Sequence, residues 1–187
     1  INTVSALIRV DSEQARRLLI QLSNFFRANL QGARTNLIPL MKELMQVEAY
    51  RSLEQARFPD RYQVTIAVEE GLEEVLLPPF LIQILLENAF KHAFGSRKTD
   101  NRVWIDVRSS PDGVFISVRD NGEGIDTKRL EKLGKEAVPS LEGTGSALDN
   151  LNKRLTSLFG ESAKLHFVSS PTGTTVHCTV PYQERQG

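Results

Sequence analysis

Five short segments after residue 60 alternate apolar and polar residues, and this alternation constrains the fold more than any other feature of the chain. A period of two is typical of strands in a sheet with one buried face. The apolar positions are Tyr62, Val64, Ile66 and Val68; Val103, Ile105 and Val107; Val114, Ile116 and Val118; Leu165 and Phe167; and Val176, Cys178 and Val180. Turn sequences at residues 110–113 and 171–173 predict two hairpins.

Helical segments are predicted between the strands, at roughly residues 79–94 and 145–159. Because hairpins are mixed with interspersed helices, the sequence predicts an α+β fold, a sandwich in which a mixed sheet carries helices on one face. Trp104, His166 and His177 alternate with the apolar positions of their strands, so we expect structural roles for them.

The first 58 residues have a helical period instead, with apolar residues every three or four positions. The first stripe is Ala15, Leu18, Leu19, Leu22, Phe25, Phe26 and Leu30, and the second is Leu37, Leu40, Met41, Leu44, Val47 and Tyr50. Gly32 lies between the stripes, where a helix often stops. We expect an antiparallel α-helical hairpin whose exposed stripe packs on a partner chain. The helical period of apolar residues ends at residues 58–60, where a turn sequence precedes the first segment with a period of two. This change predicts a helical segment over 1–58 and a second domain over 59–187.

Composition excludes several classes of protein. The 23 basic and 23 acidic residues give a net charge of zero, without the basic excess of a nucleic-acid binder, so no nucleic-acid partner is expected. Cys178 is the only cysteine, which rules out an intrachain disulfide and favours a reducing compartment. No apolar run is long enough to cross a bilayer. The chain starts at Ile1, so we expect a fragment of a parent that could have membrane spans elsewhere.

The predicted helix at residues 79–94 ends in Glu87-Asn88-Ala89-Phe90-Lys91-His92. Asn88, Lys91 and His92 are spaced i, i+3, i+4 and share one face of a helix. An amide oxygen for a hard cation and two cationic groups for phosphate form a coherent phosphate–magnesium edge. The alternative is a buried helix whose polar last turn faces water, with Lys91 and His92 complementing the helix dipole.

Two glycine-bearing segments follow. Residues 120–125 read Asp-Asn-Gly-Glu-Gly-Ile directly after a strand, where a carboxylate can accept a hydrogen bond from an exocyclic amine; the alternative is an ordinary Asn-Gly turn. Residues 142–151 read Glu-Gly-Thr-Gly-Ser-Ala-Leu-Asp-Asn-Leu and open onto a helix, where backbone N–H groups can meet phosphate. A Gly-x-Gly sequence alone is weak evidence for a phosphate-binding loop, and this one matches neither the Rossmann fingerprint nor the Walker A loop.

In this order the three segments resemble the N box, G1 box and G2 box of the GHKL ATPase superfamily, and within it those of histidine kinases. Residues 76–83 (Leu-Leu-Pro-Pro-Phe-Leu-Ile-Gln), 2–9 and 50–61 are similar to LytS/YehU-type sensor kinases, so the resemblance covers essentially the whole chain. It implies a Bergerat-type ATP-binding domain preceded by part of a helical dimerisation segment.

The resemblance also implies roles at the first two boxes. Asn88 would coordinate Mg²⁺, and Glu87 would be the carboxylate that positions or activates the phosphoacceptor. Lys91 and His92 would neutralise phosphate charge, and Asp120 would receive the adenine amino group of ATP.

The implied nucleotide contacts continue in the later segments. Gly122 and Gly124 would shape the adenine pocket, and Thr174 would line it from the last strand. Residues 122–145 would be a mobile lid. Its end and the following turn would wrap the phosphates, through Gly143, Thr144, Gly145, Ser146, Ala147 and Leu148. Ala147 departs from the family, which often has a third glycine there.

The implied activity is that of a protein-histidine kinase, with ATP and Mg²⁺ as cofactors. The γ-phosphoryl group would pass to a histidine and then to a response regulator of the LytTR type. The chain would form a homodimer through its N-terminal helices. It would be a cytoplasmic domain of a parent in the bacterial cytoplasmic membrane, reached only through missing upstream segments.

The acceptor histidine of the family is expected just before Ile1, and residues 1–57 contain no histidine. We therefore expect this fragment to bind ATP without autophosphorylating. The alternative function is a non-catalytic, nucleotide-gated protein-interaction module. A clamp-type ATPase would need larger downstream domains than the six residues after Pro181.

Overall fold

The computed structural model describes residues 11–13, 15–17, 19–20, 23, 35–126, 130 and 144–184. Most of the first predicted helical stripe, including Leu18 and Leu22, lies outside these residues, as do the predicted helix stop at Gly32 and most of the predicted lid. The predicted helical hairpin therefore stays a prediction. Among the described residues, no helix combines the length and apolar character that crossing a bilayer requires.

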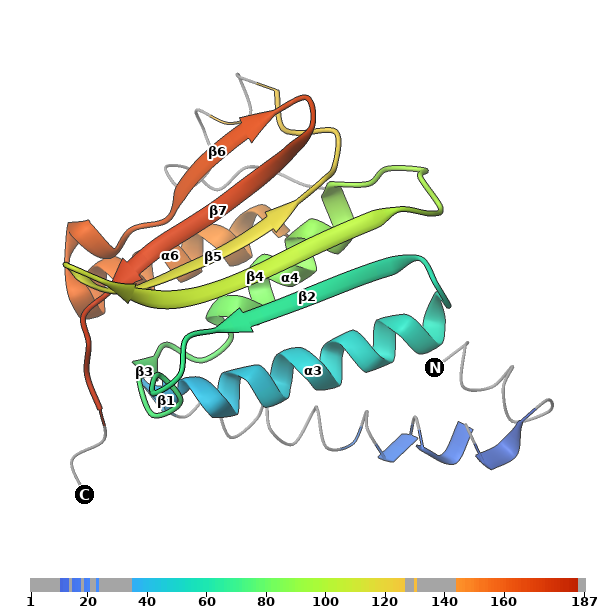
Figure 1. The fold of residues 1–187 in the computed structure, drawn as a ribbon, viewed down its shortest axis with the longest axis horizontal. Coiled ribbons are helices and arrows are strands. Elements are labelled where there is room, and N and C mark those ends of the chain that lie inside the picture. Colours follow the sequence, from blue (N-terminus) through green and yellow to red (C-terminus); the bar gives the residue numbers. More distant parts are fainter. Residues whose placement is uncertain are drawn as a thin grey trace.

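A five-stranded mixed sheet forms one layer of the molecule, with strand order β2-β4-β5-β7-β6 (Figure 1). Its strands are β2 (Tyr62–Val68), β4 (Asn101–Ser110), β5 (Gly113–Asp120), β6 (His166–Ser170) and β7 (Gly173–Val180). The β2–β4 pair is parallel, whereas the pairs β4–β5, β5–β7 and β6–β7 are antiparallel. All five predicted strands are confirmed, with one shift. Leu165 precedes β6, because its N–H donates to Asn152 Oδ1 at 2.8 Å rather than to a strand.

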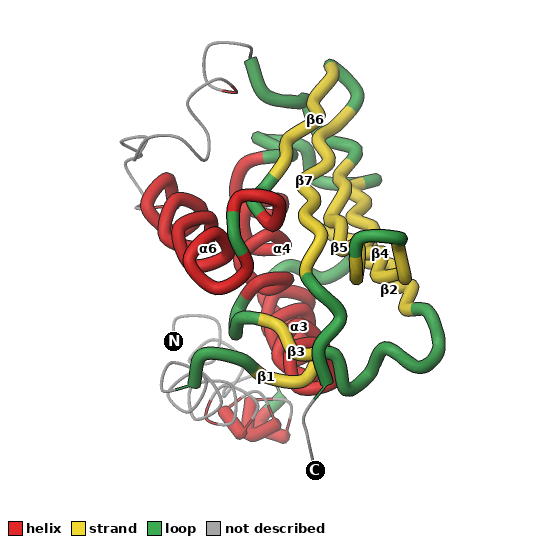
Figure 2. Tube along the Cα trace, turned by 90° about the vertical axis from the view of Figure 1, so that its left-hand side faces the viewer, coloured by secondary structure: helices red, strands yellow, loops and turns green. Residues whose placement is uncertain are grey.

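The helices lie on one face of this sheet, as predicted. They are α3 (Leu40–Arg57), α4 (Leu81–His92) and α6 (Thr144–Phe159), and Figure 2 shows them together on one side of the strands. The core between the layers is apolar. Its sheet side includes Val103, Ile105, Val107, Val114, Ile116, Cys178 and Val180, and its helix side includes Leu81, Ile82, Leu85, Leu86, Leu151 and Leu155. The predicted α+β sandwich is therefore confirmed.

The opposite face of the sheet has no helix of the described residues on it. Aromatic rings and arginines alternate there. The Arg119 guanidinium lies 5.3 Å from the Trp104 ring, and that of Arg108 lies 4.8 Å from the Phe115 ring. His166 and His177 are direct cross-strand partners with ring centroids 5.3 Å apart. These contacts fit the structural roles expected of both histidines and of Trp104.

Three short elements were not predicted. The strands β1 (Ile38–Pro39) and β3 (Leu76–Leu77) pair in an antiparallel two-stranded sheet beside the start of α3, and η1 (Glu161–Ala163) follows α6. Two residues are too few to show a period, so the sequence carries no signal for such strands.

The stripe predicted for α3 is wrong in part. Met41 is 47% exposed and Leu37 precedes the helix, whereas Glu43 is fully buried. Leu40 and Val47 join the same core as α4, so α3 packs against the domain that we predicted to begin after residue 58. The division at residue 58 stays a prediction from the sequence.

Glu43 is buried because it holds the start of α4. Its Oε2 accepts from the Phe80 N–H at 2.8 Å, and its Oε1 accepts from the N–H groups of Ile82 and Gln83 at 2.9 and 3.1 Å. The first N–H groups of a helix have no partner inside it. The N-cap residue of α4 supplies no side-chain hydrogen bond. A carboxylate from another helix therefore caps α4.

Stability is expected to depend on the protonation of Glu43. Burial raises the pKa of this carboxyl from 4.5 to about 7, against the backbone hydrogen bonds and Arg154, which lower it. Between these two pH values the folded chain holds a proton that the unfolded chain has released. The contribution is therefore fully present below about pH 4.5 and is lost as the pH rises through 7. Relative to Glu43→Gln, which does not titrate, the native chain should lose roughly 2 to 3 kcal/mol of unfolding free energy between pH 5 and 8.

Urea unfolding of both proteins across this pH range measures the difference. Val47→Ala, which removes buried volume from the same helix without changing a titratable group, is the control and should show a nearly constant offset from the native chain. A Glu43→Gln offset that is equally constant would contradict the assignment.

Candidate nucleotide-binding site

A cavity of about 130 Å³ lies where α4, α6, the end of β5 and the β6–β7 hairpin meet. Its walls are Leu85, Asn88, Ala89, His92, Ala93, Val118, Asp120, Gly124, Ile125, Asp126, Leu148, Phe167, Thr174 and Val176. Larger grooves of about 260 and 330 Å³ lie elsewhere, along α3 and β2 and on the open face of the sheet. The smaller cavity is the candidate because all three predicted segments contribute to its wall.

Asp120 supplies the buried carboxylate of this cavity. It is the last residue of β5 and is 7% exposed. Its Oδ1 accepts from the N–H of Gly122 at 2.8 Å and from the N–H of Thr174 at 3.1 Å. Burial raises its pKa, and these two hydrogen bonds and the charges of Arg97 and Arg119 oppose the rise. Since no hydrogen bond to Oδ2 is made within the described part of the chain, that oxygen can accept from a ligand.

The glycines after Asp120 permit close backbone contacts. A Cβ on Gly122 would lie 2.2 Å from the carbonyl oxygen of Ala93, at the end of α4. Gly124 has φ +75°, and a Cβ there would lie 2.0 Å from the carbonyl oxygen of Ser170. Both positions therefore require glycine, and Gly124 also lines the cavity. Gly122 acts on the cavity through Asp120, because its N–H fixes that carboxylate.

Asn88 reaches the cavity from the second half of α4. Its Nδ2 donates to the Ile84 carbonyl at 2.7 Å, one turn earlier in the helix. This bond orients the amide and leaves the Oδ1 atom as its acceptor. An amide oxygen is a suitable ligand for Mg²⁺, which is usually held by one or two protein oxygens together with substrate phosphates. Among the described residues, no three His, Cys, Asp or Glu side chains form a metal cluster.

The other polar residues of this turn differ in position. His92 is exposed and lines the cavity. Lys91 and Glu87 are not on its wall; Lys91 Nζ lies 3.3 Å from Glu87 Oε2 in an i,i+4 ion pair. The predicted set at the end of α4 thus divides into two residues on the wall and a charged pair beside it.

The third predicted segment forms the start of α6. Thr144, Gly145 and Ser146 are its first residues, Ala147 is half-buried, and Leu148 is buried on the cavity wall. Gly143 lies outside the described residues. Thr174 is buried on the wall opposite, where its Oγ1 lies 2.9 Å from Ser169 Oγ.

Sequence reasoning missed the residues that hold this site in shape. Ser169 Oγ accepts from the Ile125 N–H at 2.8 Å and ties the segment after β5 to β6. Arg97 binds Asn121 through its Nη2, at 2.9 Å to the carbonyl and 2.8 Å to Oδ1, and its Nε donates to Asn101 Oδ1 at 2.6 Å. Asn121 lies 24 residues from Arg97, and Ile125 lies 44 residues from Ser169, so no local pattern marks these contacts. Only Asn101 is close to its partner in sequence, four residues after Arg97.

The apolar wall was missed for a different reason. Phe167 and Val176 read as ordinary core positions of strands, and Leu85 and Ala89 as the buried stripe of a helix. Their periodicity assigns them to the interior correctly but cannot separate a core contact from a cavity wall.

Comparison with known proteins identifies two matching families. Residues 79–184 match the family described as "Histidine kinase-, DNA gyrase B-, and HSP90-like ATPase", and residues 1–62 match the family described as "Histidine kinase". The sensor protein LytS of Staphylococcus epidermidis is 56% identical over 98% of this chain, which corresponds to 31% of that protein. The sensor histidine kinase/phosphatase LytS of Staphylococcus aureus is 54% identical over the whole chain, or 32% of its own length.

Solved structures agree on the fold. The histidine kinase domain of the blue-light activated histidine kinase EL346 from Erythrobacter litoralis matches with a TM-score of 0.59 at 20% identity, covering 95% of this chain and 85% of that one. The catalytic domain of the histidine kinase ThkA matches with a TM-score of 0.60 at 16% identity, covering 78% and 96%. The chain spans about a third of the length of its curated relatives. It belongs to the family of histidine kinase-, DNA gyrase B- and HSP90-like ATPases.

Proposed function

We propose that this chain binds Mg·ATP and is the catalytic part of a sensor histidine kinase. One observation carries the proposal. Asp120 is buried at the cavity, its Oδ1 is held by two backbone N–H groups, and its Oδ2 is left to accept a hydrogen bond. A purine with an exocyclic amino group matches this acceptor, and the apolar walls match the faces of its ring. The N–H groups of Gly122 and Thr174 would fix Asp120 for adenine binding, and Gly124 and Thr174 would shape the wall beside it.

The triphosphate would extend from the adenine towards the end of α4 and the start of α6. Asn88 Oδ1 would hold the Mg²⁺ ion, and His92 and Lys91 would lower the repulsion around the phosphates. The backbone of the segment at Gly143, Thr144, Gly145, Ser146, Ala147 and Leu148 would face the phosphate oxygens, where the positive end of the α6 dipole favours anions. Bound Mg²⁺ supplies charge neutralisation on the phosphate oxygens.

The proposed reaction moves the γ-phosphoryl group of ATP to a histidine. The bond between the γ-phosphorus and the β–γ bridging oxygen breaks, a phosphorus–nitrogen bond to an imidazole forms, and ADP leaves. Glu87 would position the imidazole and accept its proton, and Lys91 would hold the carboxylate in place through their ion pair. A second transfer, to an aspartate of a response regulator, would complete the pathway. This chain contributes positioning and charge neutralisation.

The acceptor would be a histidine outside this chain. Of the chain's three histidines, His92 lies on the cavity wall, and His166 and His177 pair on the open face of the sheet. We further propose dimerisation through the N-terminal helices, a LytTR-type response regulator, and a parent in the bacterial cytoplasmic membrane with this part in the cytoplasm. The positions of the histidines also favour a second candidate, a nucleotide-gated interaction module that binds ATP without transferring phosphate.

Asp120→Asn should weaken ATP binding by roughly 10- to 100-fold, since a hydrogen bond to a charged group contributes about 1.5–3 kcal/mol. The loss should be equal with and without Mg²⁺, because this carboxylate faces the base. Isothermal titration with ATP and with GTP measures it, and the variant should also lose its preference for ATP. Thermal unfolding serves as the control, because an asparagine oxygen can still accept from Gly122 and Thr174. Unchanged ATP affinity would rule out the assignment of Asp120.

Asn88→Ala should instead remove the metal dependence. In the native chain Mg²⁺ should tighten ATP binding, and in the variant the affinities with and without Mg²⁺ should converge to within about threefold. ATP binding in EDTA should change little, since the adenine contacts remain. If Mg²⁺ tightens ATP binding to the variant as much as to the native chain, Asn88 is not the metal ligand.

Phosphoryl transfer separates the two candidate functions. The chain is joined to an upstream segment that carries a histidine and is incubated with radiolabelled ATP and Mg²⁺. A kinase should yield acid-labile, base-stable label on the joined protein. The label should fall at subsaturating ATP after Asp120→Asn and disappear after replacement of the added histidine. ATP binding without label would favour the interaction module.

A further inference from the structure

Glu43 joins two helices that carry different parts of the molecule. Its carboxylate is fully buried and accepts the N–H groups of Phe80, Ile82 and Gln83, which lie 37 to 40 residues later in the chain. These N–H groups belong to the start of α4, and no acidic residue of its own first turn replaces this contact. The start of α4 is therefore held by α3 rather than by its own sequence.

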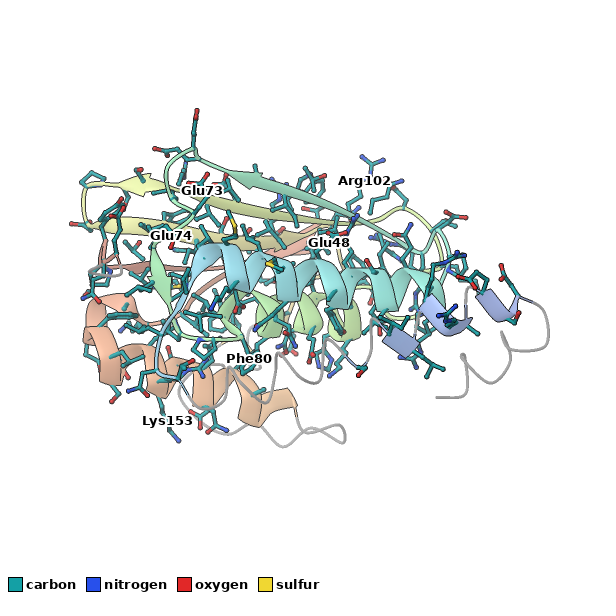
Figure 3. The ribbon with its side chains drawn as sticks, turned by 90° about the horizontal axis from the view of Figure 1, so that it is seen from below. Glu48, Glu73, Glu74, Phe80, Arg102 and Lys153 are labelled. Atoms are coloured by element: carbon teal, nitrogen blue, oxygen red, sulfur yellow. The ribbon has the colours of Figure 1, made fainter. Side chains whose placement is uncertain are left out.

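A third helix contributes to the same junction. Arg154 of α6 donates through its Nη2 to the carbonyl of Pro79, and its charge lies close enough to Glu43 to affect the carboxylate. Figure 3 labels Phe80 between α3 and α6, in agreement with these contacts. Two opposite charges from α3 and α6 thus fix the backbone on either side of Phe80.

α3 and α4 run parallel, with a contact at each end. Glu43 meets the start of α4, and seven residues later the Tyr50 ring stacks on Phe90, with centroids 5.9 Å apart. Between them lies Val47, which belongs to the apolar core. Apolar surfaces have no preferred direction and can slide, whereas three hydrogen bonds to one carboxylate fix the axial register of the two helices.

The register matters at the cavity because α4 carries Asn88. This residue lies six positions after Ile82, which is about 9 Å along a helix axis. A helix of 12 residues with a continuous hydrogen-bond ladder moves as a unit, so a shift at Ile82 reaches Asn88 undiminished. The cavity wall that contains Asp120 belongs to the sheet and would not follow.

A neutral side-chain acceptor could satisfy the same N–H groups at a smaller cost of burial, because taking a charge out of water is expensive. Burial here also raises the pKa of Glu43, which measures the cost of removing the charge from water. A costly group with directional bonds is suited to specifying one arrangement of the helices.

We propose that Glu43 is a positioning residue, which couples the axial position of α3 to that of Asn88 and so to the metal side of the nucleotide site. Movement of α3 along its axis would then change Mg·ATP binding without changing adenine recognition. This inference rests on the proposed function, because it takes Asn88 as the Mg²⁺ ligand.

The test compares ATP binding with and without Mg²⁺ at pH 8, where Glu43 is mostly ionised. In Glu43→Gln, the factor by which Mg²⁺ tightens ATP binding should fall by roughly fivefold or more, the lower end of ordinary coupling between sites. ATP affinity in EDTA should stay within about twofold of the native value, because Asp120 and the sheet are unaffected. A merely structural defect would lower both affinities by the same factor, through the fraction of competent protein.

Val47→Ala is the matched control, because it removes buried volume from the same helix contact without touching the start of α4. It should lower the unfolding free energy and leave the Mg²⁺ factor unchanged. Equal Mg²⁺ factors in Glu43→Gln and the native chain would overturn the proposal, as would an equal fall in Val47→Ala.

A second measurement uses the native chain and does not depend on how well a variant folds. Because coupling is reciprocal, Mg·ATP should slow amide hydrogen exchange at Phe80, Ile82 and Gln83 at least severalfold more than ATP in EDTA does. Equal protection by the two ligands would overturn the proposal. If Mg²⁺ does not tighten ATP binding to the native chain at all, the proposed function fails first, and the two failures are thereby distinguished.

Discussion

A helix that begins inside a protein must find acceptors for its first N–H groups, and this requirement organises the molecule around α4. α4 is apolar where it faces the sheet, and its start is buried between other elements. Its own sequence offers two prolines and Phe80 at this point, none with a side-chain acceptor. The acceptor comes from Glu43, which makes α3 part of the core and explains why a charged residue interrupts the apolar face of α3.

The same helix connects the core to the candidate site. Its buried residues lie against strands β4 and β5, and its last two turns bring Asn88 and His92 to the cavity. The other side of the cavity is the end of β5, where Asp120 is held by the turn that follows and by β7. The site is thus assembled where one helix end and one strand end meet, and the glycines at 122 and 124 allow the backbone to approach closely enough.

Most of the fold could be predicted from the sequence because its strands and helices have clear periods. Val103, Ile105 and Val107, and likewise Val114, Ile116 and Val118, recur at every second position, and the turn between the two strands has the residues that such turns require. Predictions failed where the determining contact is distant in sequence. Glu43 interrupts a helical stripe because it accepts from N–H donors 37 to 40 residues later in the chain. The two-residue strands β1 and β3 are formed by pairing with each other.

In the candidate site, too, residues of local motifs could be predicted and residues fixed by distant contacts could not. Asp120, Asn88, Gly124, Leu148 and Thr174 belong to short local motifs, and the structure brings them to one cavity. Their chemical roles stay proposals. The i,i+4 spacing of Glu87 and Lys91 on one helix favours their ion pair. The Arg97–Asn121 contact and the bond from Ile125 to Ser169 join residues 24 and 44 positions apart, so no spacing in the sequence predicts them.

The position of Trp104 has an optical consequence. It is the only tryptophan of the chain and lies under the Arg119 guanidinium on the open face of the sheet, with the sheet itself between the indole and the cavity. The intrinsic fluorescence of this indole therefore reports the integrity of strands β4 and β5. It should change little when a ligand occupies the cavity. Emission spectra of this chain register its unfolding, whereas ligand titrations call for a dye on the nucleotide or for calorimetry.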